Sequence, residues 1–158
     1  MAVSNYFNRP VWSHDGNILF GLSKYPKIQI DGYPAYWDLE NGKYSRCKTD
    51  LAPYRQIQDA GNPDNPLEVL LADSGDIQLF DLGSCEVIRT LVSHGPQTEF
   101  NDYFMIAGFS YNHSAEIMIV GLADNLYNME YKIVAHDLDT NEEVLLAFGV
   151  EPALSPDG

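Results

Sequence analysis

Short runs of alternating apolar and polar residues, separated by turn residues, follow one another along this chain of 158 residues. The segment 77–80, Ile-Gln-Leu-Phe, alternates as expected for a strand with one buried face. Asp15-Gly16 and Asn41-Gly42 stand between such runs, and both dipeptides favour the positive φ that a tight hairpin turn needs. The pattern therefore predicts an all-β protein made of short antiparallel strands.

One strand-and-turn unit occurs three times. Its clearest copy ends a strand with Trp37-Asp38 and enters a polar turn that closes at Gly42, and weaker copies carry Phe80-Asp81 and His136-Asp137. A second turn signal recurs at intervals of 49, 48 and 45 residues. It begins at Ser13, Asn62, Ser110 and Ser155. A period near 45 residues with four short strands per repeat is what a β-propeller blade requires.

The strands of the repeats can be placed between these turns. The first is expected to end at Trp12. The others are expected at 17–22, 34–37, 43–47, 54–57, 67–71, 77–80, 86–92, 104–109, 116–120, 132–135 and 143–148. The segment 110–113 is expected to be a turn, and 121–130 an insertion with room for a short helical turn at its tip.

These motifs resemble the WD40-like β-propeller family and its relatives of the TolB type. The segments 13–16, Ser-His-Asp-Gly, and 155–158, Ser-Pro-Asp-Gly, are similar to the family's turn between the first two strands of a blade. Trp37-Asp38 matches the end of the family's third strand. Phe80 and His136 stand where the family has tryptophan, so its buried network of Asp, His, Ser and Trp is not expected as a complete set.

The resemblance implies blades of four antiparallel strands, in an all-β fold. We expect residues 1–158 to form a single propeller segment, with blades at 3–50, 51–93 and 103–149 and the start of a further blade at 150–158. Propellers close with roughly four to eight blades. The ring is therefore expected to be incomplete here, with the remaining blades in the same chain or in another chain.

The charge of the chain narrows the possible partners. The sequence has 23 acidic and 9 basic residues, for a net charge of −14. Such a surface repels the phosphates of nucleic acids and of anionic membranes, and it attracts cations. No apolar run approaches the roughly 20 residues of a membrane helix. We therefore expect no nucleic-acid partner and no membrane insertion.

The two cysteines, Cys47 and Cys85, are too far apart in sequence for a Cys-x-x-Cys zinc or redox motif. They are expected either as free thiols or, in an exported protein, as one disulfide. The first ten residues lack the basic and apolar regions of a signal peptide, which slightly favours a cytoplasmic location over export.

Candidate chemistry is sparse in this sequence. Its histidines lack the spacing of metal ligands, and His136 is expected to be a packed residue at a strand end. Asp137, Asp139 and Asn141 resemble the start of a calcium loop, but the glycine and glutamate that such a loop needs further on are missing. No nucleophile elbow or phosphate loop is present in the sequence. We predict no catalytic residue, no metal site and no cofactor.

Aromatic residues in three longer connections, 23–33, 93–103 and 121–131, are the candidates for partner binding. Loops on a rigid scaffold often carry recognition, and tyrosine suits surfaces that are partly apolar and partly wet. The candidate contact residues are Tyr25, Tyr33, Phe100, Tyr103, Tyr127 and Tyr131. The expected partner is a protein or peptide, and the acidic surface favours a basic one.

The family resemblance implies a non-catalytic scaffold that mediates protein–protein interaction. The alternative is a sensor or substrate-gating propeller within a larger multidomain enzyme, such as a hydrolase or a kinase. A catalytic motif elsewhere in the full reading frame would favour the enzyme, whereas further blades would favour the scaffold.

Overall fold

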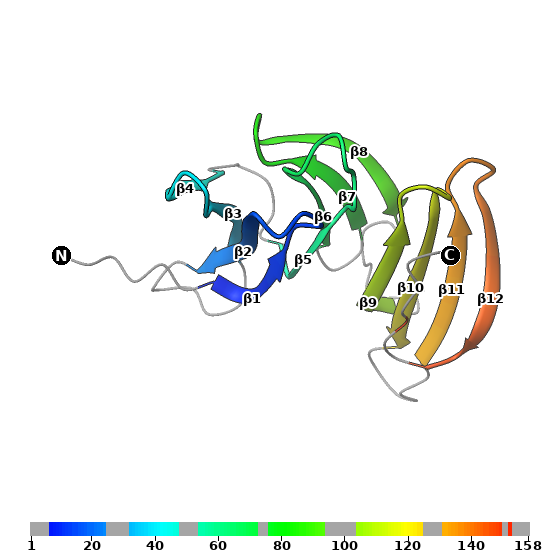
Figure 1. Cartoon of the computed structure of the whole chain (residues 1–158). Helices are drawn as coiled ribbons and strands as arrows, with labels where there is room; N and C mark the ends of the chain where they lie inside the picture. The colour runs from blue at the N-terminus through cyan, green and yellow to red at the C-terminus, as the bar shows by residue number, and fades with distance from the viewer. Residues whose placement is uncertain are drawn as a thin grey trace. The chain divides into compact units, whose positions relative to one another are not determined.

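The computed structural model describes residues 7–24, 32–47, 54–72, 76–93, 104–124, 131–149 and 152. Twelve strands form three four-stranded sheets, and each sheet is built from consecutive strands (Figure 1). The strand pairings between β1 and β4, between β5 and β7, and between β9 and β12 are antiparallel. The all-β fold expected from the turn spacing is therefore confirmed.

The strand bounds follow the predicted turns closely. The first sheet contains β1 Phe7–Trp12, β2 Ile18–Lys24, β3 Gly32–Asp38 and β4 Lys43–Arg46. The second contains β5 Gln56–Asp59, β6 Glu68–Ala72, β7 Asp76–Asp81 and β8 Glu86–Ser93. The third contains β9 Phe104–Asn112, β10 Ile117–Asp124, β11 Tyr131–Asp137 and β12 Glu142–Phe148.

The third sheet departs from the prediction at two strand ends. β9 continues through Ser110, which pairs with Ile119, as far as Asn112, so the turn predicted to start at Ser110 begins after Asn112. The Asn112 side chain then accepts a hydrogen bond from the N–H of Ala115 at 3.0 Å. β10 extends into the predicted insertion as far as Asp124, because its ladder with β9 continues to that residue.

The chain divides into two compact units. The first unit comprises residues 1–73 and 77–90 and holds the first sheet with most of the second. The second unit comprises residues 74–76 and 91–158 and holds the third sheet with the end of β8. Each unit has its own buried apolar residues.

The core of the first unit lies between two sheet faces. Alternation along β2 places Ile18, Phe20 and Leu22 on one face, and all three are buried. They share one apolar cluster with Ile57, Val69, Leu71 and Phe80 of the second sheet. Each fully buried side chain of this size contributes roughly 1.5–3 kcal/mol, so this contact supplies much of the unit's stability.

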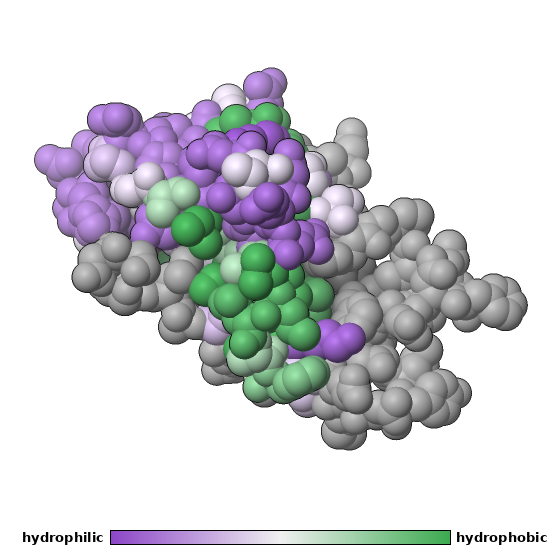
Figure 2. Space-filling model, turned by 90° about the vertical axis from the view of Figure 1, so that its right-hand side faces the viewer, coloured by the Kyte–Doolittle hydropathy of each residue, from purple (hydrophilic) through white to green (hydrophobic). Residues whose placement is uncertain are grey.

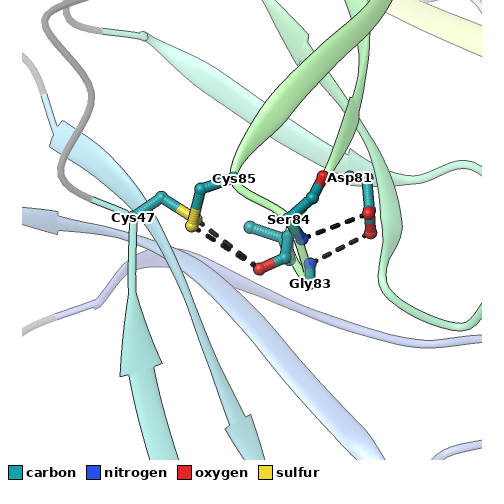
Figure 3. The surroundings of a disulfide bond; sticks show 6 residues. Cys47, Asp81, Gly83, Ser84 and Cys85 are labelled. Atoms are coloured by element: carbon teal, nitrogen blue, oxygen red, sulfur yellow. Dashed lines mark hydrogen bonds between the residues drawn. A yellow bond between two sulfur atoms is a disulfide. The ribbon is translucent and has the colours of Figure 1, made fainter.

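A disulfide joins the same two sheets. Cys47 directly follows β4, and its partner Cys85 directly precedes β8 (Figure 3). The Cα atoms are 5.4 Å apart, and the Cys47 side chain is buried. Of the two alternatives left open by the sequence, the structure shows the disulfide and not the free thiols.

Candidate interaction surface

The aspartates that end the third strand of each sheet are turn-forming residues. Asp38 accepts hydrogen bonds from the backbone N–H and the side-chain amide of Asn41, at 3.0 and 2.7 Å. Asp81 accepts them from the N–H groups of Gly83 and Ser84, at 3.0 and 3.1 Å (Figure 3). The side-chain amide of Asn41 is the main reason that the pKa of Asp38 is lowered. The two carboxylates therefore serve the local backbone rather than a ligand.

Asp137 repeats this arrangement in the third sheet. It accepts hydrogen bonds from the N–H groups of Thr140 and Asp139, at 2.9 and 3.0 Å. The Thr140 N–H is the main reason that the pKa of Asp137 is lowered. The segment that resembled a calcium loop is thus the turn between β11 and β12. In the part of the chain that the structure describes, no group of three or more acidic, histidine or cysteine residues could hold a metal ion.

The residues directly before these three aspartates occupy the same position of the repeat in the three sheets. Trp37 pairs with Leu19, Phe80 pairs with Val69, and His136 pairs with Met118 across the same ladder. Their exposures differ sharply: 42% for Trp37, 0% for Phe80 and 6% for His136. His136 is packed at a strand end as predicted, with Nδ1 3.2 Å from the Glu143 carboxylate.

Trp37 belongs to a row of large side chains across the whole first sheet. The ladder aligns Trp12 with Leu19, Leu19 with Trp37, and Trp37 with Tyr44. Trp12 is 55% exposed, and Leu19 and Tyr44 are partly exposed. Because side chains alternate along a strand, this row lies on the face opposite the buried Ile18.

Two residues extend this surface along the strands. Alternation places Tyr33 and Arg46 on the same face as Trp37 and Tyr44. The Arg46 guanidinium lies over the Tyr33 ring, 5.9 Å from its centroid, in the range of a cation–π contact. We call this surface the aromatic face; it consists of Trp12, Leu19, Tyr33, Trp37, Tyr44 and Arg46.

The third sheet presents a second apolar surface. All residues of β12 are exposed, and Val144 and Phe148 are 55% and 72% exposed. Figure 2 shows hydrophobic residues gathered on the side of the molecule where β11 and β12 lie. Single exposed apolar residues are ordinary on protein surfaces, but contiguous ones mark interaction sites.

One face of the third sheet carries part of this surface. The ladder aligns Ile119 with Ala135 and Ala135 with Val144, and it aligns Ile133 with Ala147. The opposite face is closed, because Met118 and Val120 are completely buried. We call the open side the aliphatic face; it consists of Ile117, Ile119, Ile133, Ala135, Val144 and Ala147.

Two of the six predicted contact residues can be placed. Tyr33 lies in β3, on the aromatic face, and is partly exposed. Tyr131 is the first residue of β11 in the third sheet and is also partly exposed. These residues come from different sheets. The other four, Tyr25, Phe100, Tyr103 and Tyr127, lie outside the described residues.

Sequence reasoning missed Trp12, Trp37 and Arg46 as surface residues. A signal for two of them was present, since hairpin pairing through Asp15-Gly16 aligns Trp12 with Leu19, next to Trp37. Because Trp37-Asp38 was interpreted as a structural motif of strand and turn, the candidate contact residues were placed in the longer connections instead.

A small pocket lies within the second unit. Its volume is about 180 Å³, and it lies beside the His136–Glu143 pair. The lining residues are Leu91, Val92, Ser93, His136, Asp137, Leu138, Asn141 and Glu143. Sites for drug-sized ligands usually enclose roughly 300–1,000 Å³, so this pocket is a weaker candidate than the exposed faces.

Comparison with solved structures identifies the architecture. A chain of the mitotic checkpoint complex superposes with a TM-score of 0.59 at 13% identity, covering 97% of this chain and 41% of that one. TolB from Acinetobacter baumannii gives a TM-score of 0.56 at 15% identity, covering 88% and 32%. The Cps50 (Swd1) β-propeller domain from Myceliophteria thermophila gives 0.60 at 20% identity, covering 92% and 44%.

The three sheets are β-propeller blades. This confirms the propeller architecture that the repeat period and the Trp37-Asp38 motif indicated. At these identities the likeness establishes the fold and leaves the activity open. The chain spans less than half the length of each of these three structures.

Other comparisons give no further assignment. No protein-family profile matches the sequence, and no curated protein matches it. Among the described residues, no helix has the length and apolar character needed to cross a membrane. The aromatic face and the aliphatic face of the blades are therefore the main structural guides to function.

Proposed function

We propose that this chain is a non-catalytic β-propeller scaffold that binds a protein partner. The aromatic face carries the proposal, because it presents Trp12 and Trp37 with large exposed fractions on a rigid sheet. Tryptophan, tyrosine and arginine are the residues that most often dominate binding energy at protein interfaces. The likeness to a chain of the mitotic checkpoint complex supports the same class of function, since that complex is an assembly of proteins.

The geometry explains how such a face would bind. The sheet fixes the positions of the aromatic rings, so little conformational freedom is lost when a partner covers them. Burying an exposed tryptophan removes a large apolar area from water. The acidic surface of the chain, with a net charge of −14, speeds association with a basic partner. The predicted contacts by Tyr25, Phe100, Tyr103, Tyr127 and Tyr131 remain part of this proposal.

The test compares variants in a quantitative capture experiment. Wild-type chain, Trp37→Ala and Glu40→Ala are immobilised and exposed to extract from the source cells. Glu40 is the control, since it is exposed in the turn after β3 and outside the aromatic face. The proposal expects proteins that bind wild type and Glu40→Ala but are lost with Trp37→Ala. Equal capture by all three variants would contradict a role for this face.

A further inference from the structure

We propose that the Cys47–Cys85 disulfide is a redox-sensitive latch: a small thiol reduces it in the folded chain, and its reduction loosens strand β4. The latch lies within the first unit, to which both cysteines belong. The alternative is a purely structural disulfide, which would open only when the unit unfolds.

The backbone conformation of Cys85 is one that cysteine adopts at a cost. Its φ is 62°, in the left-handed region, and Gly42 and Asn141 occupy the equivalent positions of the other two sheets. Glycine and asparagine tolerate this conformation, whereas a cysteine is disfavoured there because of its Cβ atom. The sulfur, rather than the backbone, therefore accounts for a cysteine at this position.

The two cysteines differ in their access to solvent. Cys47 is only 1% exposed, whereas Cys85 is partly exposed in the turn between β7 and β8. Thiol–disulfide exchange requires a thiolate to reach one of the two sulfur atoms, and exposed disulfides are the more easily reduced ones. An external thiol is therefore expected to attack Cys85, with Cys47 as the leaving group.

The reduction consists of two displacements. The thiolate of a first external thiol attacks Cys85 Sγ, a new S–S bond forms, and the bond to Cys47 breaks with its electron pair on Cys47 Sγ, which takes up a proton. A second external thiolate then attacks the external sulfur of this mixed disulfide and releases Cys85, which is also protonated. Two external thiols are thereby oxidised to one disulfide, and the two cysteines gain two electrons and two protons.

The reduced state has a hydrogen-bond acceptor within reach of both thiols. The sulfurs of Cys47 and Cys85 lie 3.6 and 3.7 Å from the carbonyl oxygen of Leu82, and Figure 3 shows both directed at one oxygen. A disulfide has no S–H group, so reduction supplies the donors, and a carbonyl oxygen can accept from two. The Leu82 N–H donates to the carbonyl oxygen of Leu67 at 3.0 Å, which helps to hold the acceptor in place. The site thus suits either redox state.

Strand β4 is the element that the bond holds. It is the outer strand of the first sheet, and none of its four residues is buried. Cys47 follows it directly and is the first buried residue after Ala35. The Cys47 N–H also donates to the carbonyl oxygen of Pro34 at 2.9 Å, which extends the pairing of β3 with β4. Because strands with few buried side chains open locally at low free energy, β4 is expected to loosen first on reduction.

The latch has a consequence for binding. β4 carries Tyr44 and Arg46 of the aromatic face, and Arg46 directly precedes Cys47. The Arg46 guanidinium lies over the Tyr33 ring, so loosening of β4 would displace it. The reduced chain should therefore bind a partner of the aromatic face more weakly. This consequence rests on the proposed function, whereas the latch itself does not.

Reduction kinetics test whether the bond opens in the folded chain. The full chain is treated with dithiothreitol or reduced glutathione, and free thiols are followed by alkylation and mass spectrometry. The reduction rate should rise in proportion to thiol concentration and stay unchanged in low urea, and the glutathione adduct should form on Cys85. A rate that rises with urea as steeply as global unfolding, or an adduct mainly on Cys47, would overturn the latch.

Hydrogen exchange tests whether reduction loosens β4. Cys85→Asn mimics the reduced state without reductant, because asparagine tolerates the left-handed turn at the equivalent Asn141. Reduction of wild type and Cys85→Asn should each speed exchange in β4 about tenfold or more beyond any change in β2. Added reductant should leave Cys85→Asn unaffected, which makes this variant the control for direct effects of the thiol.

Equal acceleration in β4 and β2, or none in β4, would contradict the latch. Circular dichroism checks that Cys85→Asn is folded. If it is not, Cys85→Gly takes its place, since glycine occurs at the equivalent Gly42. Reduced wild type provides the same comparison without a substitution.

The capture experiment separates the latch from the proposed function. Weaker capture by Cys85→Asn than by wild type, together with faster exchange in β4, supports both. Faster exchange in β4 with capture that does not depend on Trp37 supports the latch and overturns the proposed function. Unchanged exchange in β4 with capture through Trp37 overturns the latch and leaves the scaffold proposal intact. Capture through Trp37 that is equal in Cys85→Asn, despite a loosened β4, overturns the consequence for binding.

Discussion

Trp37 in the first sheet and Phe80 in the second occupy the same position of the repeat, yet Trp37 is 42% exposed and Phe80 is buried. Both residues are large and aromatic, so residue type does not explain the difference. Phe80 shares a core with Phe20 of the first sheet and meets the Tyr54 ring edge-on, with 6.3 Å between the ring centroids. Among the residues that the structure describes, Trp37 belongs to no such core and makes no such ring contact. Exposure at this position thus reports whether another sheet covers the face, and a large aromatic residue at the same repeat position can be part of the core or be exposed.

The largest expected effect on stability comes from substitutions at this repeat position, which is buried in the second sheet and exposed in the first. Phe80→Ala should lower the free energy of unfolding by roughly 3–5 kcal/mol, because it empties a fully buried ring site. Trp37→Ala should change it by less than about 1 kcal/mol, since much of that ring is exposed. Urea unfolding of the isolated chain measures both. Similar losses for the two variants would show that Trp37 is already covered.

The disulfide distinguishes the first unit from the second. Cys47 and Cys85 are 38 residues apart, and a bond that closes a loop of this size typically stabilises by about 2–4 kcal/mol. Reduction should therefore destabilise the first unit while leaving the second largely unaffected. Hydrogen exchange with and without reductant measures this, and equal loss of protection in β2 and β10 would contradict it.

The location of the protein is tested by the same bond. Disulfides persist mainly in oxidising compartments, whereas the sequence slightly favoured the cytoplasm. Titration of free thiols in protein taken from its source cells should find none if the bond forms there. Two reactive thiols per chain would favour the cytoplasmic prediction.

A smaller effect on stability is expected in the turns that begin at Asp38, Asp81 and Asp137, at the fifth residue counted from the aspartate. Gly42, Cys85 and Asn141 hold this position in the three blades, with φ values of 61°, 62° and 58°. Gly42→Ala should cost about 1 kcal/mol, because alanine resists a left-handed backbone. Asn141→Gly is the control and should change stability by only a few tenths, since both residues tolerate this conformation. An equal loss of stability in both variants would contradict this, because it would mean that the backbone of the turn adjusts to either residue.

These turns also show how far the sequence could predict the fold. Asn41-Gly42 and Asp15-Gly16 carry their conformation in their own residues, so strands and hairpins could be placed from them. Cys85 gave no such signal, because its left-handed backbone occurs beside a disulfide that depends on a distant Cys47. The early end predicted for β9 failed for a similar reason, since its last residues are held by pairing with β10.

The candidate interaction surface was less predictable than the fold. Tyr33 was predicted because tyrosines near loops are common contact residues. The structure places it beside Arg46, and its contact with a partner stays a prediction. Trp37 was read as a structural residue because its motif is one of strand and turn. Whether its ring is covered depends on a blade that local sequence does not encode.

The smallest effect concerns two aspartates whose pKa values move in opposite directions. Burial raises the pKa of Asp59, on β5, although hydrogen bonds from Gly61 and His14 partly oppose this. Burial also acts on Asp81, but there the hydrogen bonds from Ser84, Gly83 and Asn65 outweigh it and lower the pKa. The first carboxylate is thus harder to ionise in the folded chain than in the unfolded chain, and the second is easier to ionise.

The signs of their pH dependence follow from linkage. The folded state binds the Asp59 proton more tightly, so stability falls as pH rises from the unfolded carboxyl pKa of about 3.9 through the raised folded value. Asp81 stabilises above that unfolded pKa, and its contribution is lost as pH falls through the lowered folded value.

The contributions of Asp59 and Asp81 to the free energy of unfolding should therefore change in opposite directions across mildly acidic pH, and unfolding curves of two variants measure this. Asp59→Asn should gain stability relative to wild type towards neutral pH, because its amide oxygen can still accept the Gly61 N–H bond. Asp81→Asn should lose stability there. Parallel pH profiles for the two variants would show that burial does not separate the two aspartates.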